Sequence, residues 1–431
     1  MIKKTFKNLI IILNTLLLFS FLSGCSSTEK LSSTSNPSVA STSSSKVTDK
    51  VANTSENTSA KDPVKASANT ITPSIAPTVN PVVSGAKNAV SSITSSASTT
   101  KPKNAIPVSK ITGVESFKNA IIVNLSQGKD LSINLSTQYT KDNIADKVMR
   151  VVETSGYAGY VSGIQYSIYN NVAYIYFQYK GGSENFLTKS KAVDTIVKSI
   201  VSKVVTATMS DYEKEVALHD YVINSVDYDY ANLLKNTIPE DSYTAYGSLI
   251  KKVAVCEGYA EAMNKLLTTA GVNSYIINGL GNGVAHEWNL VNIDGGIYHL
   301  DATFDDPIST EGKVLTHNYF NVNDEQMSKN HNWNSADYPI STAIAANYFT
   351  VNDLLASNKS KYYEIIKKEI IKRNTVISIR TSAYDPLTFT SDAVTKILKD
   401  NKEINYINTT SGYTYSYDQT TNVIQIGIKY K

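Results

Sequence analysis

The stretch from Lys251 to Pro307 constrains this chain more than any other, because it places three complementary side chains in a fixed order. Val-Cys-Glu-Gly-Tyr-Ala carries the thiol of Cys256, His-Glu-Trp-Asn carries the imidazole of His286, and Asp-Ala-Thr-Phe-Asp-Asp-Pro carries the carboxylate of Asp301. A thiol becomes a strong nucleophile when a base takes its proton, and a third group commonly orients that base. We therefore expect the fold to bring these three side chains together.

The residues after Cys256 predict a helix that begins at the cysteine. Apolar residues recur there at helical spacing, and Gly271 stands where a helix commonly ends (Tyr259, Ala260, Met263, Leu266, Leu267 and Ala270). A cysteine in the first helical turn feels the positive end of the helix dipole, which favours thiolate over thiol. Gly258 and Ala260 keep that turn narrow, so we expect a substrate backbone to approach Cys256 closely.

The two runs that carry His286 and Asp301 predict a β-hairpin. His286–Ile293 and Ile297–Phe304 are separated by Asp-Gly-Gly, and Asp-Gly is a strong signal for a two-residue turn. Such a turn pairs Ile293 with Gly296, whereas a three-residue loop would put the imidazole and the carboxylate on opposite faces of the sheet. A site made from both side chains therefore predicts the shorter turn.

With the shorter turn, Asp301 lies opposite Trp288 and diagonal to His286 on one face of the hairpin. Diagonal neighbours are about 7–8 Å apart, within reach of a hydrogen bond between a histidine and an aspartate. His299 falls on the Asp301 face as well and is the rival base. We favour His286, because it lies at the open end of the hairpin, where a helix N-terminus can approach.

The N-terminus has the pattern of an export signal. Three lysines precede the apolar run Leu9–Leu22, and Leu-Ser-Gly-Cys ends at Cys25. This ending resembles a bacterial lipoprotein lipobox, which implies cleavage before Cys25, lipidation of its thiol and an extracytoplasmic protein anchored to the membrane. An ordinary signal peptide and an uncleaved anchor are the alternatives. With Cys25 lipidated, Cys256 is the one remaining thiol, and an intrachain disulfide cannot form.

Composition and pattern divide the chain into five segments. Residues 1–25 form the signal peptide, and residues 26–106, rich in Ser, Thr, Ala, Asn and Pro, are expected to form a disordered linker because they bury too little apolar surface. Residues 107–182 form a small α+β module, residues 183–345 a catalytic domain and residues 346–431 a second α+β module. A net charge of only +3, without basic blocks among aromatics, argues against nucleic-acid binding.

The two small modules are expected to order their elements alike, as strand, helix and hairpin. The first has a strand at Leu131–Thr137, a helix at Asp142–Thr154 and a hairpin that turns at Asn170-Asn171; the second has Thr375–Thr381, Ser391–Asp400 and a hairpin over 412–430. They are either related copies or two unrelated α+β pieces. Binding or packing is the default role of both, because neither carries a group of reactive side chains.

Two helices are expected to open the central domain, at Lys191–Val204 and from a capping box at Ser210–Glu213. His219 and Asp220 on the second helix suggest a metal or relay pair, but adjacent helix residues do not share a face, which favours a surface or edge role. Asp305-Asp306 suggest a calcium site, and more simply the turn that ends a strand before Pro307.

Taken together, these motifs resemble the transglutaminase-like superfamily, in its bacterial surface branch. The resemblance covers about residues 212–333 and rests on Cys256-Glu-Gly-Tyr-Ala, His286-x-Trp-Asn and the Asp301 motif. It includes Ser-Tyr-Thr-Ala-Tyr-Gly at 242–247, Tyr-Phe-Asn-Val at 319–322 and His-Asn-Trp at 331–333. Three ordered motifs at plausible spacing are far more specific than any one of them.

The resemblance implies a papain-like α+β fold, in which a helix that carries Cys256 packs against an antiparallel sheet that carries His286 and Asp301. It further implies that Cys256 is the nucleophile, His286 the general acid and base, and Asp301 the group that orients the imidazole. The family's reaction attacks a carboxamide or peptide carbonyl and forms a thioester, which an amine or water resolves. It requires no cofactor and no metal.

The oxyanion donors are less defined than the triad. The backbone N–H of Cys256 is one candidate, because the first helical turn leaves donors free. Tyr246 is the side-chain candidate, although an upstream aromatic is as often part of the packing. Ala254 replaces a glycine that is common in relatives, and Glu287 replaces a small residue; in a strand Glu287 should point away from the site.

The sequence leaves three functions open. The first is a membrane-tethered thiol enzyme that acts on protein or peptide amides at the cell surface. The second is a cysteine peptidase, or a hydrolase of cell-wall peptides, with the same three residues and water as the acceptor. The third is a surface-binding protein whose triad is vestigial.

Overall fold

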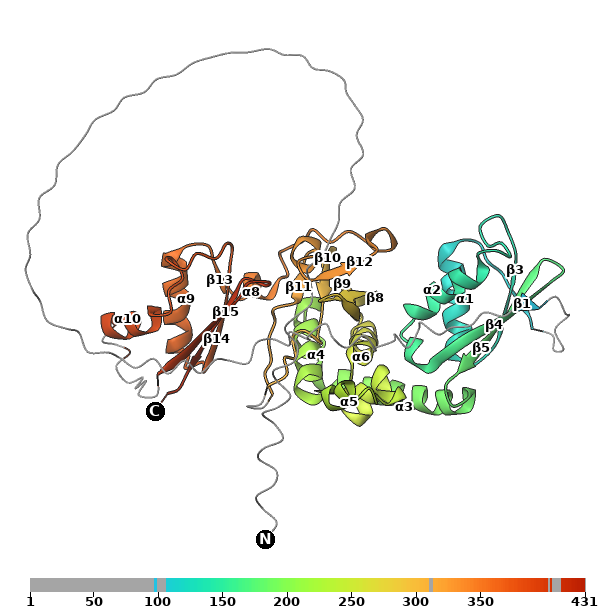
Figure 1. Cartoon of the computed structure of the whole chain (residues 1–431), viewed down its shortest axis with the longest axis horizontal. Coiled ribbons are helices and arrows are strands. Elements are labelled where there is room, and N and C mark those ends of the chain that lie inside the picture. Colours follow the sequence, from blue (N-terminus) through green and yellow to red (C-terminus); the bar gives the residue numbers. More distant parts are fainter. Residues whose placement is uncertain (1–96, 99–105, 310–312, 402–403, 405–411, 431) are drawn as a thin grey trace, which may run out of the picture. The chain divides into compact units, whose positions relative to one another are not determined.

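The structure is a computed structural model that describes residues 97–98, 106–309, 313–401, 404 and 412–430 (Figure 1). The predicted signal peptide with Cys25, and nearly all of the predicted linker, lie outside the described residues. Within the described part of the chain, none of the helices is long and apolar enough to cross a membrane. Helices and sheets mix throughout the three folded regions, so the chain is an α+β protein as expected.

The N-terminal module is a mixed sheet packed against two helices. Its elements are β1 (Ala97–Ser98), β2 (Val108–Ser109), α1 (Val114–Ser126), β3 (Leu131–Asn134), α2 (Ile144–Glu153), β4 (Val161–Tyr169) and β5 (Val172–Tyr179). Tyr169 pairs with Val172, and Asn170 and Asn171 have φ angles of 47° and 60°, so the predicted hairpin and its turn are confirmed. The prediction missed α1, whose Phe117, Ile121 and Leu125 are buried in the module's core.

The C-terminal module repeats this element order. It consists of β13 (Leu355–Ala356), α9 (Lys359–Ile371), β14 (Val376–Thr381), α10 (Ala393–Asp400), β15 (Tyr413–Asp418) and β16 (Val423–Ile428). In both modules a short strand pairs in parallel with the next strand, which pairs antiparallel with the last strand of the hairpin. The prediction missed α9, the counterpart of α1. The two modules thus share one topology, β-α-β-α-β-β.

The central domain places helices against an antiparallel sheet. Its longer helices are α3 (Ser183–Val204), α4 (Asp211–Ser225) and α6 (Cys256–Thr269), and its sheet has the order β11-β10-β9-β8-β12. The strands of that sheet are β8 (Asn273–Gly281), β9 (Val284–Ile293), β10 (Gly296–Leu300), β11 (Phe320–Val322) and β12 (His331–Trp333). Smaller elements are β6 (Asp227–Tyr228), α5 (Tyr230–Lys235), a π-helical turn at Gly247–Lys251, β7 (Val253–Ala254), α7 (Asp324–Met327) and α8 (Tyr348–Val351).

The main core of this domain lies between the helices and one face of the sheet. Buried side chains of α3, α4 and α6 pack there with Val291 and Ile293 of β9. Ser210 caps α4 by accepting a hydrogen bond from the backbone N–H of Glu213, as the capping-box pattern predicts. Asn289 Nδ2 donates to the carbonyl of Ala260, which shows that the odd-numbered positions of β9 face α6.

The hairpin of β9 and β10 turns as the sequence predicts. Ile293 pairs with Gly296, and Asp294 and Gly295 have φ angles of 50° and 83°. Positive φ at both central residues defines the two-residue turn that suits a twisted hairpin. Leu300 pairs with Asn289, so the chain leaves the strand at Asp301.

The expectation for His219 was wrong. Its ring is fully buried, and His219 Nδ1 lies 3.0 Å from Asp220 Oδ1. The prediction assumed that adjacent helix residues diverge, but the Asp220 carboxylate bends back toward the imidazole of its neighbour.

The turn that was expected to follow the strand carrying His299 is present after β10, where Asp305 N–H donates to the carbonyl of Asp301.

Candidate active site

Cys256 is the first residue of α6, with Val255 at the N-cap position. The cysteine is buried, and its thiol donates to Glu257 Oε2 over 3.1 Å. Burial and the neighbouring Glu257 carboxylate raise the pKa of the Cys256 thiol well above its ordinary value. Desolvation and a nearby negative charge thus oppose the helix dipole here, and they favour the thiol over the expected thiolate.

The narrow first turn of α6 lets the segment before Cys256 pack closely against the helix. A Cβ atom at Gly258 would lie 2.7 Å from the carbonyl oxygen of Ser242, 2.8 Å from the Cβ of Ala254 and 2.9 Å from the carbonyl oxygen of Thr244. The N–H of Val255 donates to the same Ser242 carbonyl. The glycine lets the upstream segment pass close beneath the helix, so this segment takes the space that we had assigned to a substrate backbone.

Glu287 also departs from the expectation, because its side chain is buried near the thiol rather than turned away from it. It is only 5% exposed, and its charge adds to the rise of the Cys256 pKa. Burial raises the pKa of Glu287 well above its ordinary value, and the charge of Glu257 raises it further. The prediction failed because the face of β9 that carries Glu287 is the face toward α6.

His286 and Asp301 meet as the hairpin register predicts. His286 Nε2 lies 2.7 Å from Asp301 Oδ2, while Asp301 Oδ1 accepts hydrogen bonds from the N–H groups of Thr303 and Phe304, each over 3.0 Å. Burial would raise the pKa of Asp301, but His286 and His331 more than offset it, and the pKa lies below its usual range. The carboxylate is thus ionised and fixed at both oxygens.

His331 of β12 is a partner that the sequence prediction did not assign to the site. Its Nε2 lies 3.0 Å from the same Asp301 Oδ2, and its Nδ1 lies 2.7 Å from the side chain of Asn330. Burial lowers the pKa of His331, so the ring is neutral near pH 7. The sequence did mark His331, since His-Asn-Trp at 331–333 forms part of the family resemblance. No rule of sequence spacing, however, placed His331 beside Asp301.

His299, the rival base, has both ring nitrogens engaged elsewhere. Trp288 Nε1 donates to His299 Nδ1 over 2.9 Å, which leaves the ring proton on Nε2, 2.7 Å from Asp324 Oδ1. The ring is fully buried. His299 is therefore a structural member of the sheet, and His286 is the better candidate for the base.

The thiol and the imidazole are not hydrogen-bonded to each other. Among the described residues, no hydrogen bond joins Cys256 Sγ to His286, since the thiol donates to Glu257 and the imidazole Nε2 faces Asp301. The nitrogen of His286 that is left for a thiol proton is Nδ1. Proton transfer therefore requires the thiol to leave Glu257 and to approach His286, which is on the other face of β9 from Glu287.

The setting of Tyr246 fits the packing role that the sequence left open beside the role of oxyanion donor. The ring of Tyr246 lies under the ammonium groups of Lys189 and Lys251, 5.5 and 5.8 Å from its centroid, and packs against the main core. Burial raises the pKa of Tyr228, and the charges of Cys256, Glu257 and Asp301 raise it further. The Tyr228 hydroxyl is thus close enough to both Cys256 and Asp301 for their charges to act on it. The spacing of the sequence motifs did not indicate that Tyr228 belongs to the site.

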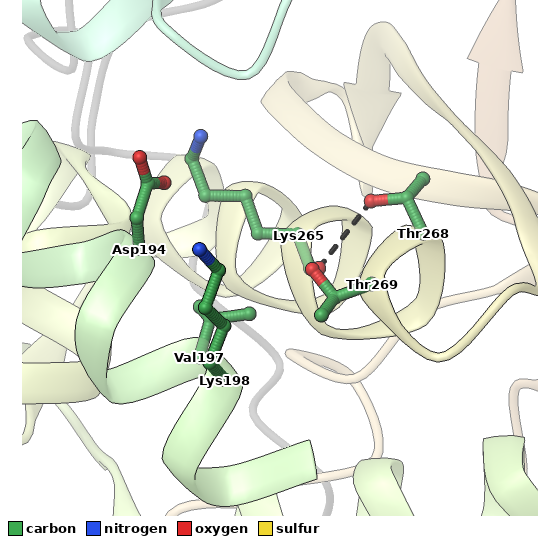
Figure 2. A pocket seen from close by; sticks show the side chains of 6 residues that line it. All are labelled: Asp194, Val197, Lys198, Lys265, Thr268 and Thr269. Atoms are coloured by element: carbon green, nitrogen blue, oxygen red, sulfur yellow. Dashed lines mark hydrogen bonds between the residues drawn. The ribbon is translucent and has the colours of Figure 1, made fainter. Parts of the chain in front are cut away.

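A pocket of about 210 Å³ between α3 and α6 lies outside this site. Figure 2 shows its lining residues, which are Asp194, Val197, Lys198, Lys265, Thr268 and Thr269. Lys265 follows Cys256 by nine residues along α6, roughly 13 Å at 1.5 Å per residue. The pocket is therefore at the opposite end of the helix from the thiol.

Glu261, one turn beyond Glu257, should make folding stability depend on pH. It is buried and accepts a hydrogen bond from the N–H of Ala245, and burial raises its pKa from 4.5 to about 7. The folded state then holds a proton that the unfolded state loses above pH 4.5. Stability should fall as pH rises toward 7, by on the order of 3 kcal/mol in total.

Glu261→Gln should remove this loss, because a neutral amide carries no charge to desolvate. Both oxygens of Glu261 accept backbone N–H groups, from Ala245 and Gly159, so the amide loses one acceptor at every pH. Relative to the unmodified chain, we therefore expect the variant to be more stable at pH 8 than at pH 4 by on the order of 2–3 kcal/mol, as measured by urea unfolding. Glu325→Gln, at an exposed position, is the matched control and should change stability little at either pH. A Glu261→Gln gain that does not vary with pH would contradict this assignment.

Comparison with known proteins agrees with the fold described above. Residues 198–302 match the family model of the transglutaminase-like superfamily, so the chain carries a transglutaminase-like domain. This segment contains Cys256, His286 and Asp301. A search of curated proteins found no match.

Solved structures give weak likenesses. A TGase crystal structure is 14% identical, with 46% of this chain and 58% of that chain covered and a TM-score of 0.24. A putative cysteine protease from Cytophaga hutchinsonii is 16% identical, with 35% and 46% covered and a TM-score of 0.23. An arylamine N-acetyltransferase from Bacillus cereus, described with a Cys-His-Glu triad, is 11% identical, with 26% and 48% covered and a TM-score of 0.20. This chain thus spans about half the length of these proteins.

Proposed function

We propose that this chain is a thiol enzyme of the transglutaminase-like superfamily, tethered outside the cytoplasm through a lipid on Cys25, that attacks amide carbonyls of proteins or peptides. The observation that carries the proposal is the 2.7 Å contact between His286 and Asp301. It orients an imidazole on the hairpin that packs beside the helix starting at Cys256. A buried ionised carboxylate also stabilises the imidazolium that forms when the ring takes a proton.

The proposed reaction uses the Cys256 thiol and His286 Nδ1, the ring nitrogen that does not face Asp301. The thiol leaves Glu257 and passes its proton to His286 Nδ1 while sulfur attacks the carbonyl carbon. The tetrahedral intermediate then expels the amine, which takes the proton back from the imidazolium, and a thioester on Cys256 remains. An amine or water attacks the thioester, loses its proton to His286, and releases the thiol.

Glu257 sets the resting state of this cycle. It holds the thiol as a protonated donor and raises its pKa, so nucleophile formation depends on a substrate that separates the two groups. The thiol of the free enzyme should therefore react with iodoacetamide no faster than an ordinary cysteine, and faster once a slowly turned-over substrate is bound.

The direct test combines acyl-enzyme trapping with product analysis. The full chain is incubated with a glutamine-containing peptide and a fluorescent primary amine, quenched in acid and digested, and the fragment with Cys256 is weighed. We expect a thioester adduct on that fragment and amine coupled to the peptide. Peptide release without coupling would assign hydrolysis instead of transfer. If a folded chain forms no adduct with glutamine-containing or cell-wall peptides, a vestigial triad and a binding role replace the proposal.

A further inference from the structure

A second, partly buried group of histidine and aspartate side chains lies outside the candidate active site. We call it the α4 cluster: His219 and Asp220 of α4, Asp305 after β10, and His317 before β11. The chain has five histidines, and the other three belong to the network around Trp288 and Asp301 described above. The mechanism proposed above uses no member of the α4 cluster.

The contacts of the α4 cluster converge on one carboxylate oxygen. Asp220 Oδ1 lies 3.0 Å from His219 Nδ1 and 2.8 Å from His317 Nε2. One ligand atom from each of these three residues lies within 4.8 Å of the others. Tyr348 stacks on the His317 ring, with centroids 3.6 Å apart and an interplanar angle of 3°, and so fixes its orientation.

The far side of the His219 ring is left without a hydrogen bond. His219 Nε2 faces Asp305 Oδ2 across 3.3 Å, and both atoms are buried without a hydrogen-bond partner among the described residues. A protonated ring forms an ion pair with Asp305 here, but the contact lacks the geometry of a hydrogen bond. Buried polar atoms without a hydrogen bond cost free energy, and a group bound at Nδ1 that lets Nε2 donate to Asp305 would remove the cost.

We propose that His219 Nδ1, Asp220 Oδ1 and His317 Nε2 bind a divalent transition-metal cation, with zinc as the best match. A cation at this position takes the lone pair of His219 Nδ1 and puts the ring proton on Nε2, where it can be donated to Asp305. Two imidazole nitrogens and one carboxylate oxygen form a donor set typical of zinc. The proposal departs from the sequence interpretation, which expected no metal.

The distances fit such a site after small movements. Zinc binds nitrogen and oxygen ligands at about 2.0–2.2 Å, so tetrahedral neighbours lie roughly 3.4 Å apart. The present separations of 2.8 and 3.0 Å are those of hydrogen bonds at the same positions, and shifts of about half an ångström would open them. The Asp220 side chain is 31% exposed, which leaves an approach for the cation and for water as the fourth ligand.

The residues behind the ligands resemble the outer shell of a metal site. A histidine that binds a metal commonly donates its other N–H to a carboxylate, which fixes the ring and strengthens the ligand. Asp305 has this position, and its Oδ1 is itself held by the N–H of Tyr319 at 2.9 Å and the hydroxyl of Thr316 at 3.1 Å. A cation here would link α4 directly to His317, and through His219 to Asp305.

Zinc titration of the full chain, after removal of metal with a chelator, tests the proposal. We expect one strong equivalent by calorimetry and an increase in melting temperature of several degrees. His317→Gln should weaken zinc binding at least tenfold, and Asp305→Asn by about 10–100-fold, as for other outer-shell carboxylates. His331→Gln is the matched control, because it alters the other histidine–aspartate group, and it should leave zinc affinity unchanged.

Cobalt(II) gives a readout that does not depend on the stability of the variants. Bound to the unmodified chain, it should show the intense visible bands of a four-coordinate site with nitrogen and oxygen ligands, and zinc should displace it. The proposal is overturned if the unmodified chain binds zinc no better than His317→Gln, or if His331→Gln is the change that abolishes binding. A folded chain with only the weak bands of six-coordinate cobalt would likewise overturn it.

Discussion

Asp301→Asn is expected to lower the rate of acyl transfer by about 10³–10⁴-fold while leaving the fold in place. The N–H groups of Thr303 and Phe304 hold one oxygen of residue 301, so the amide oxygen of asparagine will take that position. Its NH₂ group then points at His286 Nε2 and forces that nitrogen to be an acceptor. The ring proton moves to Nδ1, the atom that has to receive the thiol proton, and the imidazolium loses its counter-charge.

The measurement is the rate of amine incorporation and of thioester formation by the purified variant. Asp324→Asn is the matched control, because it removes the carboxylate beside the rival His299 and should change the rate by no more than a few-fold. A large loss in Asp324→Asn with a small loss in Asp301→Asn would make His299 the base. Circular dichroism of both variants separates a lost base from a lost fold.

Trp288→Ala is expected to destabilise the central domain by about 3–5 kcal/mol, the usual cost of removing a buried aromatic side chain. Trp288 is 1% exposed and stacks on His286, with centroids 5.9 Å apart. It also contacts Trp333 edge-on at 5.9 Å. The chain leaves room for the indole at Gly279, where a Cβ would lie 2.7 Å from the ring. The side chain thus joins β8, β9 and β12.

Urea unfolding of Trp288→Ala and Trp288→Phe separates packing from hydrogen bonding. The phenylalanine variant keeps most of the buried area and loses only the indole N–H that pairs with His299 Nδ1. It should therefore cost about 1–3 kcal/mol, the price of an unpaired buried acceptor. A cost below about 1 kcal/mol for the alanine variant would show that the sheet does not depend on this ring.

The parts of the site that could be predicted are those that local chain geometry decides. Asp294-Gly295 allows a turn with positive φ at both central residues, and the register of β9 and β10 follows from that turn. That register places His286 next to Asp301, because strand positions alternate with a period of two. The helix that begins at Cys256 was predictable in the same way, from apolar spacing and a terminal glycine.

The parts that could not be predicted depend on contacts between distant segments. His331 reaches Asp301 because β12 pairs with β8, and a strand of three residues is too short to show alternation. The resting thiol depends on how deeply Cys256 is buried, and a helix N-terminus in a sequence does not reveal desolvation. His219 looked like a surface residue because adjacent positions diverge on an isolated helix, whereas here Asp305 and His317 lie against its ring.

The hydrogen bond from Cys256 to Glu257 has a consequence for the durability of the protein. Peroxides oxidise thiolates to sulfenic acid far faster than they oxidise thiols. A cysteine kept protonated, buried and paired with a carboxylate should persist for long periods in an oxidising medium. Oxidation of Cys256 would then be confined to the brief intervals in which a substrate is being processed. The loss of active protein should therefore depend on the number of turnovers rather than on the time spent in the medium.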